Sequence, residues 1–217
     1  MDAHGPKLFY SPGACSLAPH IALEETGEEF EPVLVDFGAG AQRKPEYLAI
    51  NPKGRVPALA DDGFVVTENP AVLRYIARKY PAAGLWPDDL RADGRCTEWL
   101  GWFTSGVHVA YAHMRRPERY ATSDAGKADV VVRGKVSTRE VWEQVEAKLA
   151  SLGTQWAAGE RYSVADPYLF TFWTWGRGKA LLYDMSRDFP CWTDHARRMG
   201  ERPAVRCALA REGIAPP

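Results

Sequence analysis

The residue best placed for chemistry is Cys15, which follows the turn-forming segment 11–14, Ser-Pro-Gly-Ala. A helical pattern starts at Ser16, so the thiol would stand at a helix N-terminus, where free N–H groups and a partial positive charge lower a thiol pKa. A buried structural cysteine is the alternative. A serine at this position is more often an N-cap than a catalytic hydroxyl, and both roles are considered for Ser16. Because Ala18 follows three residues later, no resolving cysteine is present, and a two-cysteine disulfide exchanger is not expected.

Two further motifs could contact a peptide-like ligand. Segment 51–59 carries Pro57 at the start of an expected strand, where a proline is often cis and turns the backbone groups of Val56 outward. Glu68 and Asn69 then bring an acid and a helix N-terminus together, which suit an ammonium and a carboxylate. Taken separately, a loop entering a strand and a capped helix explain both motifs equally well.

The elements that would position these residues alternate in the first part of the chain. We expect strands over 7–10, 30–37, 56–60 and 64–67, the last two joined by a hairpin at Asp62-Gly63. Helical patterns cover 16–26, 45–50 and 69–80, with Asn69 as N-cap and Pro70 at the first helical position. The order β-α-β-α-β-β-α predicts a small mixed sheet.

Beyond residue 90 the pattern is helical throughout. Cys96, Trp99 and Phe103 form an apolar stripe along one predicted helix, and we expect about five helices in this part of the chain. We therefore expect an α/β plus all-α protein with a first domain over 1–81, a linker over 82–88 and an all-helical domain over 89–217.

Composition narrows the possible partners. The formal net charge of the 217 residues is -1, and no run of Lys and Arg marks a basic groove, so we expect neither nucleic acid nor membrane as a partner. The four cysteines form no CxxC pair and no zinc-ligand spacing, so no metal is expected. Without a basic-then-apolar leader pattern, we expect a cytoplasmic protein with reduced thiols.

Together the three motifs, along with Glu98-Trp99-Leu100, Val107-His108 and 162–166 (Tyr-Ser-Val-Ala-Asp), resemble the glutathione S-transferase superfamily, specifically the bacterial beta class. The resemblance spans about residues 7 to 213. It implies a thioredoxin-like domain that binds glutathione as co-substrate, followed by a helical domain, in a homodimer.

The resemblance also implies roles for individual residues. Val56 would pair its backbone with the cysteinyl part of glutathione beside a cis Pro57, and Glu68 and Asn69 would hold the γ-glutamyl group. The implied catalytic residues are Cys15, Ser16, His108 and Tyr10, and the implied glutathione-binding residues are Cys15, Lys53, Val56, Pro57, Glu68, Asn69, Ser105 and His108. Helical spacing places Gly101, Ser105 and His108 on one face.

Some positions depart from the family pattern. Asn69 is followed by Pro70, the loop 38–42 lacks the usual lysine, and Val109 replaces a common basic residue. We therefore expect thin cationic support for the glycyl carboxylate of glutathione, unless Lys53 or Arg43 provides it.

Three functions follow as alternatives. The first is conjugation of glutathione to a small apolar electrophile, bound near Trp102, Tyr111 or Trp173. The second is thiol reduction through a mixed disulfide at Cys15. The third is a non-catalytic ligand- or partner-binding protein on the same fold.

Overall fold

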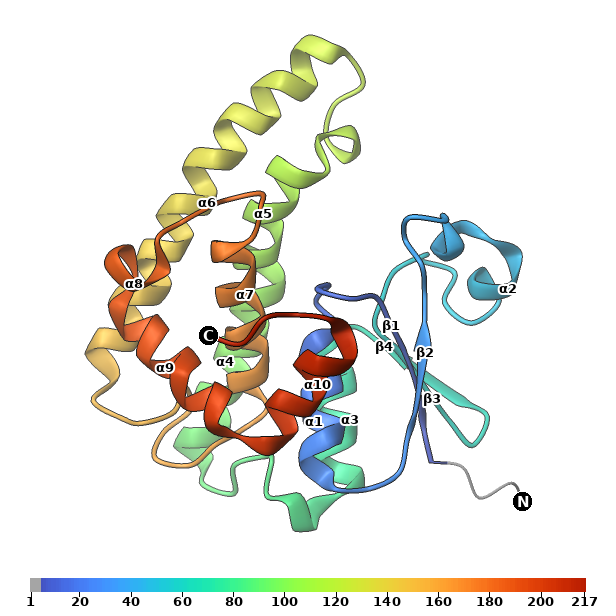
Figure 1. The fold of residues 1–217 in the computed structure, drawn as a ribbon, viewed down its shortest axis with the longest axis vertical. Coiled ribbons are helices and arrows are strands. Elements are labelled where there is room, and N and C mark those ends of the chain that lie inside the picture. The colour runs from blue at the N-terminus through green and yellow to red at the C-terminus, as the bar shows by residue number, and fades with distance from the viewer. Residues whose placement is uncertain (1–4) are drawn as a thin grey trace.

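The computed structural model describes residues 5–217, shown in Figure 1. Four strands and three helices come first: β1 (Lys7–Tyr10), α1 (Leu17–Thr26), β2 (Glu31–Leu34), α2 (Pro45–Leu48), β3 (Ala58–Asp61), β4 (Phe64–Thr67) and α3 (Asn69–Lys79). Seven α-helices follow: α4 (Leu90–Trp102), α5 (His108–Arg115), α6 (Asp124–Leu152), α7 (Ala165–Arg177), α8 (Met185–Asp188), α9 (Pro190–Glu201) and α10 (Pro203–Glu212).

The sheet has the strand order β2-β1-β3-β4. Strand β1 runs parallel to β2, because α1 crosses between them, and the other pairs are antiparallel. Residues alternate between the two faces: Leu8 and Leu59 enter the main core, while Phe9 and Ala58 enter a smaller core with Tyr47 of α2. This arrangement confirms the predicted mixed sheet and the thioredoxin-like first domain.

The main core continues from the first domain into the helical domain. It includes Leu17 and Ile21 of α1 together with Trp99, Phe103 and Phe172 of the helical domain, all fully buried. Burial of one aromatic side chain contributes a few kcal/mol, so this continuous core fixes the position of the cleft between the domains. None of the helices within residues 5–217 has the length and apolar character that a bilayer span requires.

Several predicted boundaries were wrong. Residues 5–217 contain seven α-helices from Leu90 onward rather than about five, partly because Pro190 begins a new helix directly after the four-residue α8. Strand β2 covers only Glu31–Leu34. Asn69 is the first residue of α3 and not its N-cap, since Glu68 occupies the cap position with a φ of 73°.

Candidate functional site

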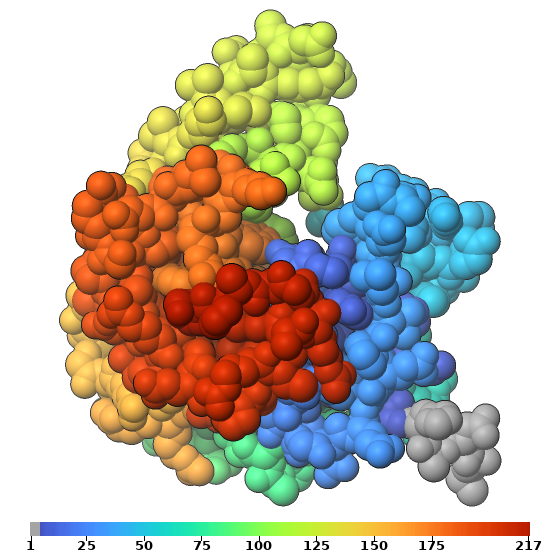
Figure 2. Space-filling model, viewed as in Figure 1, coloured from blue at the N-terminus to red at the C-terminus, as the bar shows by residue number. Residues whose placement is uncertain are grey.

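Two contiguous cavities lie between the domains, at the N-terminal end of α1. The smaller, which we call the α3 cavity, has a volume of about 150 Å³ and includes Pro57, Glu68 and Asn69 in its wall. The larger, which we call the arginine cavity, has a volume of about 390 Å³. The two share Cys15, Arg55, Val56, His108, Ala112 and Arg119. In Figure 2 the surface is hollowed between the green end of α5 and the blue and cyan residues of the first domain.

Cys15 is where the two cavities meet. Its thiol donates a hydrogen bond to the carbonyl of Val56, with an Sγ to O distance of 3.4 Å. Burial raises the pKa of this thiol to about 12, and its own backbone N–H and the Asn69 side chain offset only part of the rise. The expected lowered pKa was therefore wrong, because desolvation outweighs the helix N-terminus. At neutral pH, Cys15 is a neutral hydrogen-bond donor.

The other two motifs meet beside this cysteine. The Val56–Pro57 peptide bond is cis, as the resemblance implied. Asn69 is buried, and its side-chain amide donates to the carbonyl of Cys15 at 2.9 Å, while its Oδ1 atom has no partner within residues 5–217. Glu68 has a positive φ, an uncommon conformation for a non-glycine residue that is often found at functional sites. No sequence signal announces that strain.

His108 lines both cavities from the helical side. Its ring packs edge-on against Trp175, with centroids 5.1 Å apart. Burial, assisted by the charges of Arg119 and Arg55, lowers the pKa of His108 from 6.5 to about 4. The imidazole is consequently neutral at pH 7.

Ser105 does not share this position. Residues Phe103–Val107 form a π-helix, whose wider turn breaks the expected i, i+4, i+7 register. Ser105 is exposed and donates its hydroxyl hydrogen bond to the carbonyl of Gly101 at 3.0 Å. Thr104 lines the α3 cavity instead. The predicted polar face was wrong because an α-helical period does not hold through this turn.

Three other predicted residues stand behind or beside the cavity walls. The Ser16 hydroxyl is buried and closes the preceding turn, accepting from the backbone N–H of Ser11 at 3.1 Å. Tyr10 packs against His20, with ring centroids 5.1 Å apart. Lys53 forms an ion pair with Glu68 at 2.5 Å and so positions that carboxylate. None of the three lines either cavity.

An aromatic wall closes the arginine cavity. Tyr111 stacks on Trp175, with centroids 4.5 Å apart and planes 28° from parallel. The Trp175 indole N–H donates to the carbonyl of Gly13 at 2.8 Å, which joins this wall to the turn before Cys15. The expected Trp102 and Trp173 lie elsewhere: Trp102 packs on Trp99, and Trp173 is buried against Phe170.

The turn before Cys15 is also held from α10. Gly13 has a φ of 69°, which a glycine adopts without strain. Its N–H donates to Oε2 of Glu212 at 2.9 Å, and Oε1 of Glu212 lies 2.8 Å from Nδ1 of His20. Both of these side chains are fully buried. No local sequence pattern predicts this pairing, because its partners are 192 positions apart.

The arginine cavity is lined mainly by positively charged side chains, which the sequence patterns did not predict. Five arginines line the arginine cavity, against the single carboxylate of Glu118: Arg43, Arg55, Arg115, Arg116 and Arg119. The expected Arg43 is among them, and the other four were not anticipated from the sequence. These arginines come from three separate segments, so no single run of basic residues reveals them.

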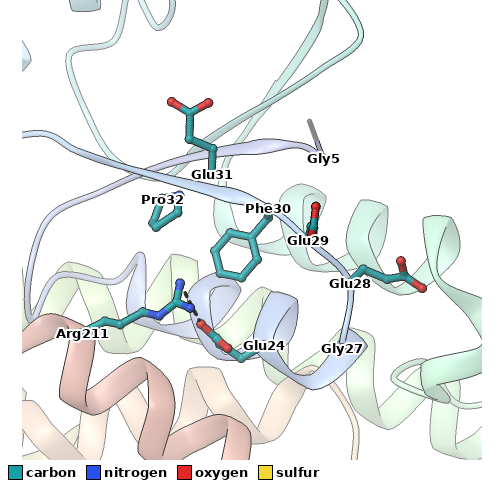
Figure 3. A pocket seen from close by; sticks show the side chains of 9 residues that line it. All are labelled: Gly5, Glu24, Gly27, Glu28, Glu29, Phe30, Glu31, Pro32 and Arg211. Atoms are coloured by element: carbon teal, nitrogen blue, oxygen red, sulfur yellow. Dashed lines mark ion pairs between the residues drawn. The ribbon is translucent and has the colours of Figure 1, made fainter. Parts of the chain in front are cut away.

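A third cavity, with a volume of about 600 Å³, lies at the other end of α1 (Figure 3). Four glutamates line it, Glu24, Glu28, Glu29 and Glu31, and we call it the glutamate cavity. Arg211 reaches into it and pairs with Glu24 at 3.3 Å. Its lining contains neither a thiol nor a histidine, so it does not share the chemistry of the cleft.

Comparisons with known proteins agree with the site. Residues 6–78 match the glutathione S-transferase N-terminal domain, and residues 106–203 match the glutathione S-transferase C-terminal domain. The chain is 35% identical to glutathione S-transferase GstA of Escherichia coli O157:H7, over 96% of this chain and 99% of that protein.

Two solved structures extend this agreement to three dimensions. A glutathione transferase homologue from Sulfitobacter with bound glutathione superposes with a TM-score of 0.88 at 36% identity, covering 97% of this chain and 99% of that one. A sphingomonad glutathione S-transferase complexed with glutathione gives a TM-score of 0.80 at 42% identity, covering 96% and 100%. Bacterial beta-class enzymes are also among the structural neighbours. The chain therefore belongs to the glutathione S-transferase family of enzymes.

Proposed function

We propose that this protein conjugates the thiol of glutathione to a small aromatic electrophile. The observation that carries the proposal is the convergence of Cys15, Val56 with its cis peptide bond, and the start of α3 on one cavity that opens directly into a second. The α3 cavity would hold the γ-glutamyl and cysteinyl parts of glutathione, and the arginine cavity would receive its glycyl end and the electrophile. Glutathione is present in the related structures from Sulfitobacter and a sphingomonad, which supports this assignment.

The γ-glutamyl end of glutathione has two matching groups in the α3 cavity. The Glu68 carboxylate suits the γ-glutamyl ammonium, and the Asn69 backbone N–H, at the first position of α3, suits the neighbouring carboxylate. Pro70 contributes no N–H, so Asn69 bears most of that task. The carbonyl of Val56 would then receive the cysteinyl N–H.

The Cys15 thiol would act through its hydrogen. Because its pKa is raised to about 12, Cys15 stays protonated, and it can turn its S–H from the Val56 carbonyl toward the glutathione sulfur. A donor in that position stabilises the glutathione thiolate, which then attacks the electrophile. The same raised pKa disfavours the thiol reductase alternative, since a mixed disulfide at Cys15 forms when the Cys15 thiolate attacks a disulfide sulfur and expels the other sulfur as a thiolate.

The test is calorimetric titration of the reduced protein with glutathione, followed by conjugation of 1-chloro-2,4-dinitrobenzene. We expect saturable binding, and we expect Glu68→Gln to weaken it by about tenfold, because one charge-assisted hydrogen bond is lost. Glu201→Gln, an exposed glutamate at the end of α9, is the matched control and should bind normally.

Two variants of the cysteine separate the alternatives. Cys15→Ala should lower conjugation while leaving glutathione affinity nearly unchanged. If the protein is instead a reductase, Cys15→Ser should abolish the reductase activity while conjugation persists. Absence of glutathione binding in the unmodified protein would overturn the proposal and favour the non-catalytic alternative.

We also propose a cytoplasmic homodimer, as the family resemblance implies. Exposed apolar side chains, including Phe64, Leu90 and Val132, offer surface that a partner subunit would cover. Light scattering of the purified protein tests this directly, and a mass equal to one chain would contradict it.

A further inference from the structure

We propose that the electrophile is an anionic aromatic molecule, such as a ring bearing a carboxylate, whose negative group is held by Arg115, Arg116 and Arg119. This inference rests on the proposed function, and it replaces the sequence-based expectation of an apolar electrophile.

Like charges face each other across the cleft. Arg55 comes from the loop before β3, and Arg119 comes from the turn after α5, yet both line the same two cavities. They lie close enough that burial, followed by the charges of Arg55 and Arg116, lowers the pKa of Arg119. Within residues 5–217, no ion pair to a carboxylate involves any of the five arginines of the arginine cavity. An anion in this cavity would relieve the repulsion between these guanidinium groups.

Glutathione does not account for all of this charge. It has two carboxylates, and the γ-glutamyl carboxylate is assigned to the start of α3. Its glycyl carboxylate requires one or two cations, and we assign it to Arg55, which lines both cavities, together with Arg43 of the same domain. The three arginines of the helical domain remain. Arg115 and Arg116 line only the arginine cavity, where the second substrate would bind.

The wall beside these arginines suits a flat ring. Tyr111 and Trp175 stack on one another, and Arg115 stands one turn beyond Tyr111 on α5. The charge of Arg115 offsets part of the rise that burial causes in the pKa of Tyr111, so its guanidinium lies near the phenol. A ring against Tyr111 would therefore bring a ring substituent within reach of the arginines. A cavity of about 390 Å³ accommodates a small molecule and not a polymer.

The chemical step balances without any further reactant. With 4-chloro-3,5-dinitrobenzoate as the probe, the glutathione sulfur attacks the ring carbon that bears chlorine. A C–S bond forms with the sulfur electron pair, the C–Cl bond breaks, chloride leaves with its bonding electrons, and the thiol proton passes to solvent. The carboxylate takes no part in the bond changes, so it serves only as the group that is recognised.

The experiment compares this probe with its methyl ester, which has the same ring and leaving group but no charge. For each, kcat/KM is divided by the uncatalysed rate with glutathione. We expect the acid to be favoured over the ester by about tenfold, as one good charge-assisted contact would provide. Added salt should lower this preference by screening.

Single substitutions then locate the effect. Arg116→Gln and Arg119→Gln should each reduce the acid-to-ester ratio severalfold, and together they should abolish the preference. Arg91→Gln, an exposed arginine in the first turn of α4, is the control and should leave the ratio unchanged. All three arginines are exposed, so the variants should fold, and thermal unfolding verifies this.

The outcomes are distinguishable. If the ester is conjugated as well as the acid, or if the ratio survives in the double variant, the inference is overturned while the proposed function stands. If neither probe reacts and glutathione does not bind, the proposed function itself fails.

Discussion

The arginine cavity and the glutamate cavity lie at the two ends of the same helix, α1, and they differ in almost every respect. The glutamate cavity is the larger, at about 600 Å³ against 390 Å³. Five arginines and one glutamate line the arginine cavity, whereas four glutamates and one arginine line the glutamate cavity. Volume alone would select the wrong site.

What distinguishes the arginine cavity is the convergence of distant segments. Its wall joins the turn before Cys15, the loop before the cis Pro57 and the end of α5, and it includes the half-buried His108. The glutamate cavity is built mainly from consecutive residues around the end of α1 and the start of β2. Buried polar groups that many elements hold in place are costly, and they mark the site that performs chemistry.

The two ends also relate differently to the helix dipole. At the N-terminus of α1, the partial positive charge adds to the arginines and favours an anion. At the C-terminus, the partial negative charge adds to the glutamates. Neighbouring residues of α10 serve both ends: Arg211 pairs with Glu24 in the glutamate cavity, and Glu212 holds Gly13 beside the arginine cavity. Three variants test how far this contrast extends.

The largest effect is expected from His108. The pKa of His108 is about 4 in the folded protein, against its ordinary value of 6.5 in the unfolded chain. Between pH 4 and pH 6.5 the unfolded chain therefore binds the proton more readily than the folded protein. Stability should therefore be fully present above pH 6.5 and decline as the pH falls toward 4. The depressed pKa corresponds to a loss of about 3 kcal/mol in the free energy of unfolding over this interval.

Urea unfolding at a series of pH values measures this loss. We expect His108→Asn to lack this part of the decline, since asparagine cannot take up a proton. Identical pH dependence in the variant and the unmodified protein would contradict the interpretation. A nuclear magnetic resonance signal for His108 titrating near its ordinary value would contradict it as well.

A smaller effect is expected from Glu212→Gln. The glutamate carboxylate serves two partners, the N–H of Gly13 and the ring of His20, and glutamine offers only one oxygen acceptor. We expect a loss of about 2 kcal/mol in the free energy of unfolding, as for other buried charge-assisted hydrogen bonds. Glu201→Gln is again the control. If the two variants were equally stable, Glu212 would not hold the turn.

How much of this could be predicted depended on the distance between partners. The mixed sheet, the hairpin at Asp62-Gly63 and the cis Pro57 follow from short sequence patterns, and the structure contains all three. Such features are set by neighbours in the sequence, where the spacing of apolar residues and turn-forming residues is informative.

The errors have physical causes that no local pattern reveals. Ser105 was misplaced because the π-helix over Phe103–Val107 changes the helical period. The pKa of Cys15 was misjudged because burial depends on the whole domain interface. The arginine cavity was missed because Arg43, Arg55 and Arg119 meet only after both domains fold.

The smallest effect is expected from the glutamate cavity itself. Glu28 and Glu29 are exposed, and neither forms an ion pair within residues 5–217. Because α1 has 10 residues, and so is about 15 Å long, they lie beyond a Debye length of about 8 Å from Cys15 at physiological salt. The double substitution Glu28→Gln, Glu29→Gln should change the free energy of unfolding by less than about 0.5 kcal/mol. It should also leave both glutathione affinity and the acid-to-ester ratio unchanged. A change in the glutathione affinity or in the acid-to-ester ratio, measured in the same assays, would mean that charges at one end of α1 affect binding at the other. The two cavities would then share one electrostatic field and would not be independent sites.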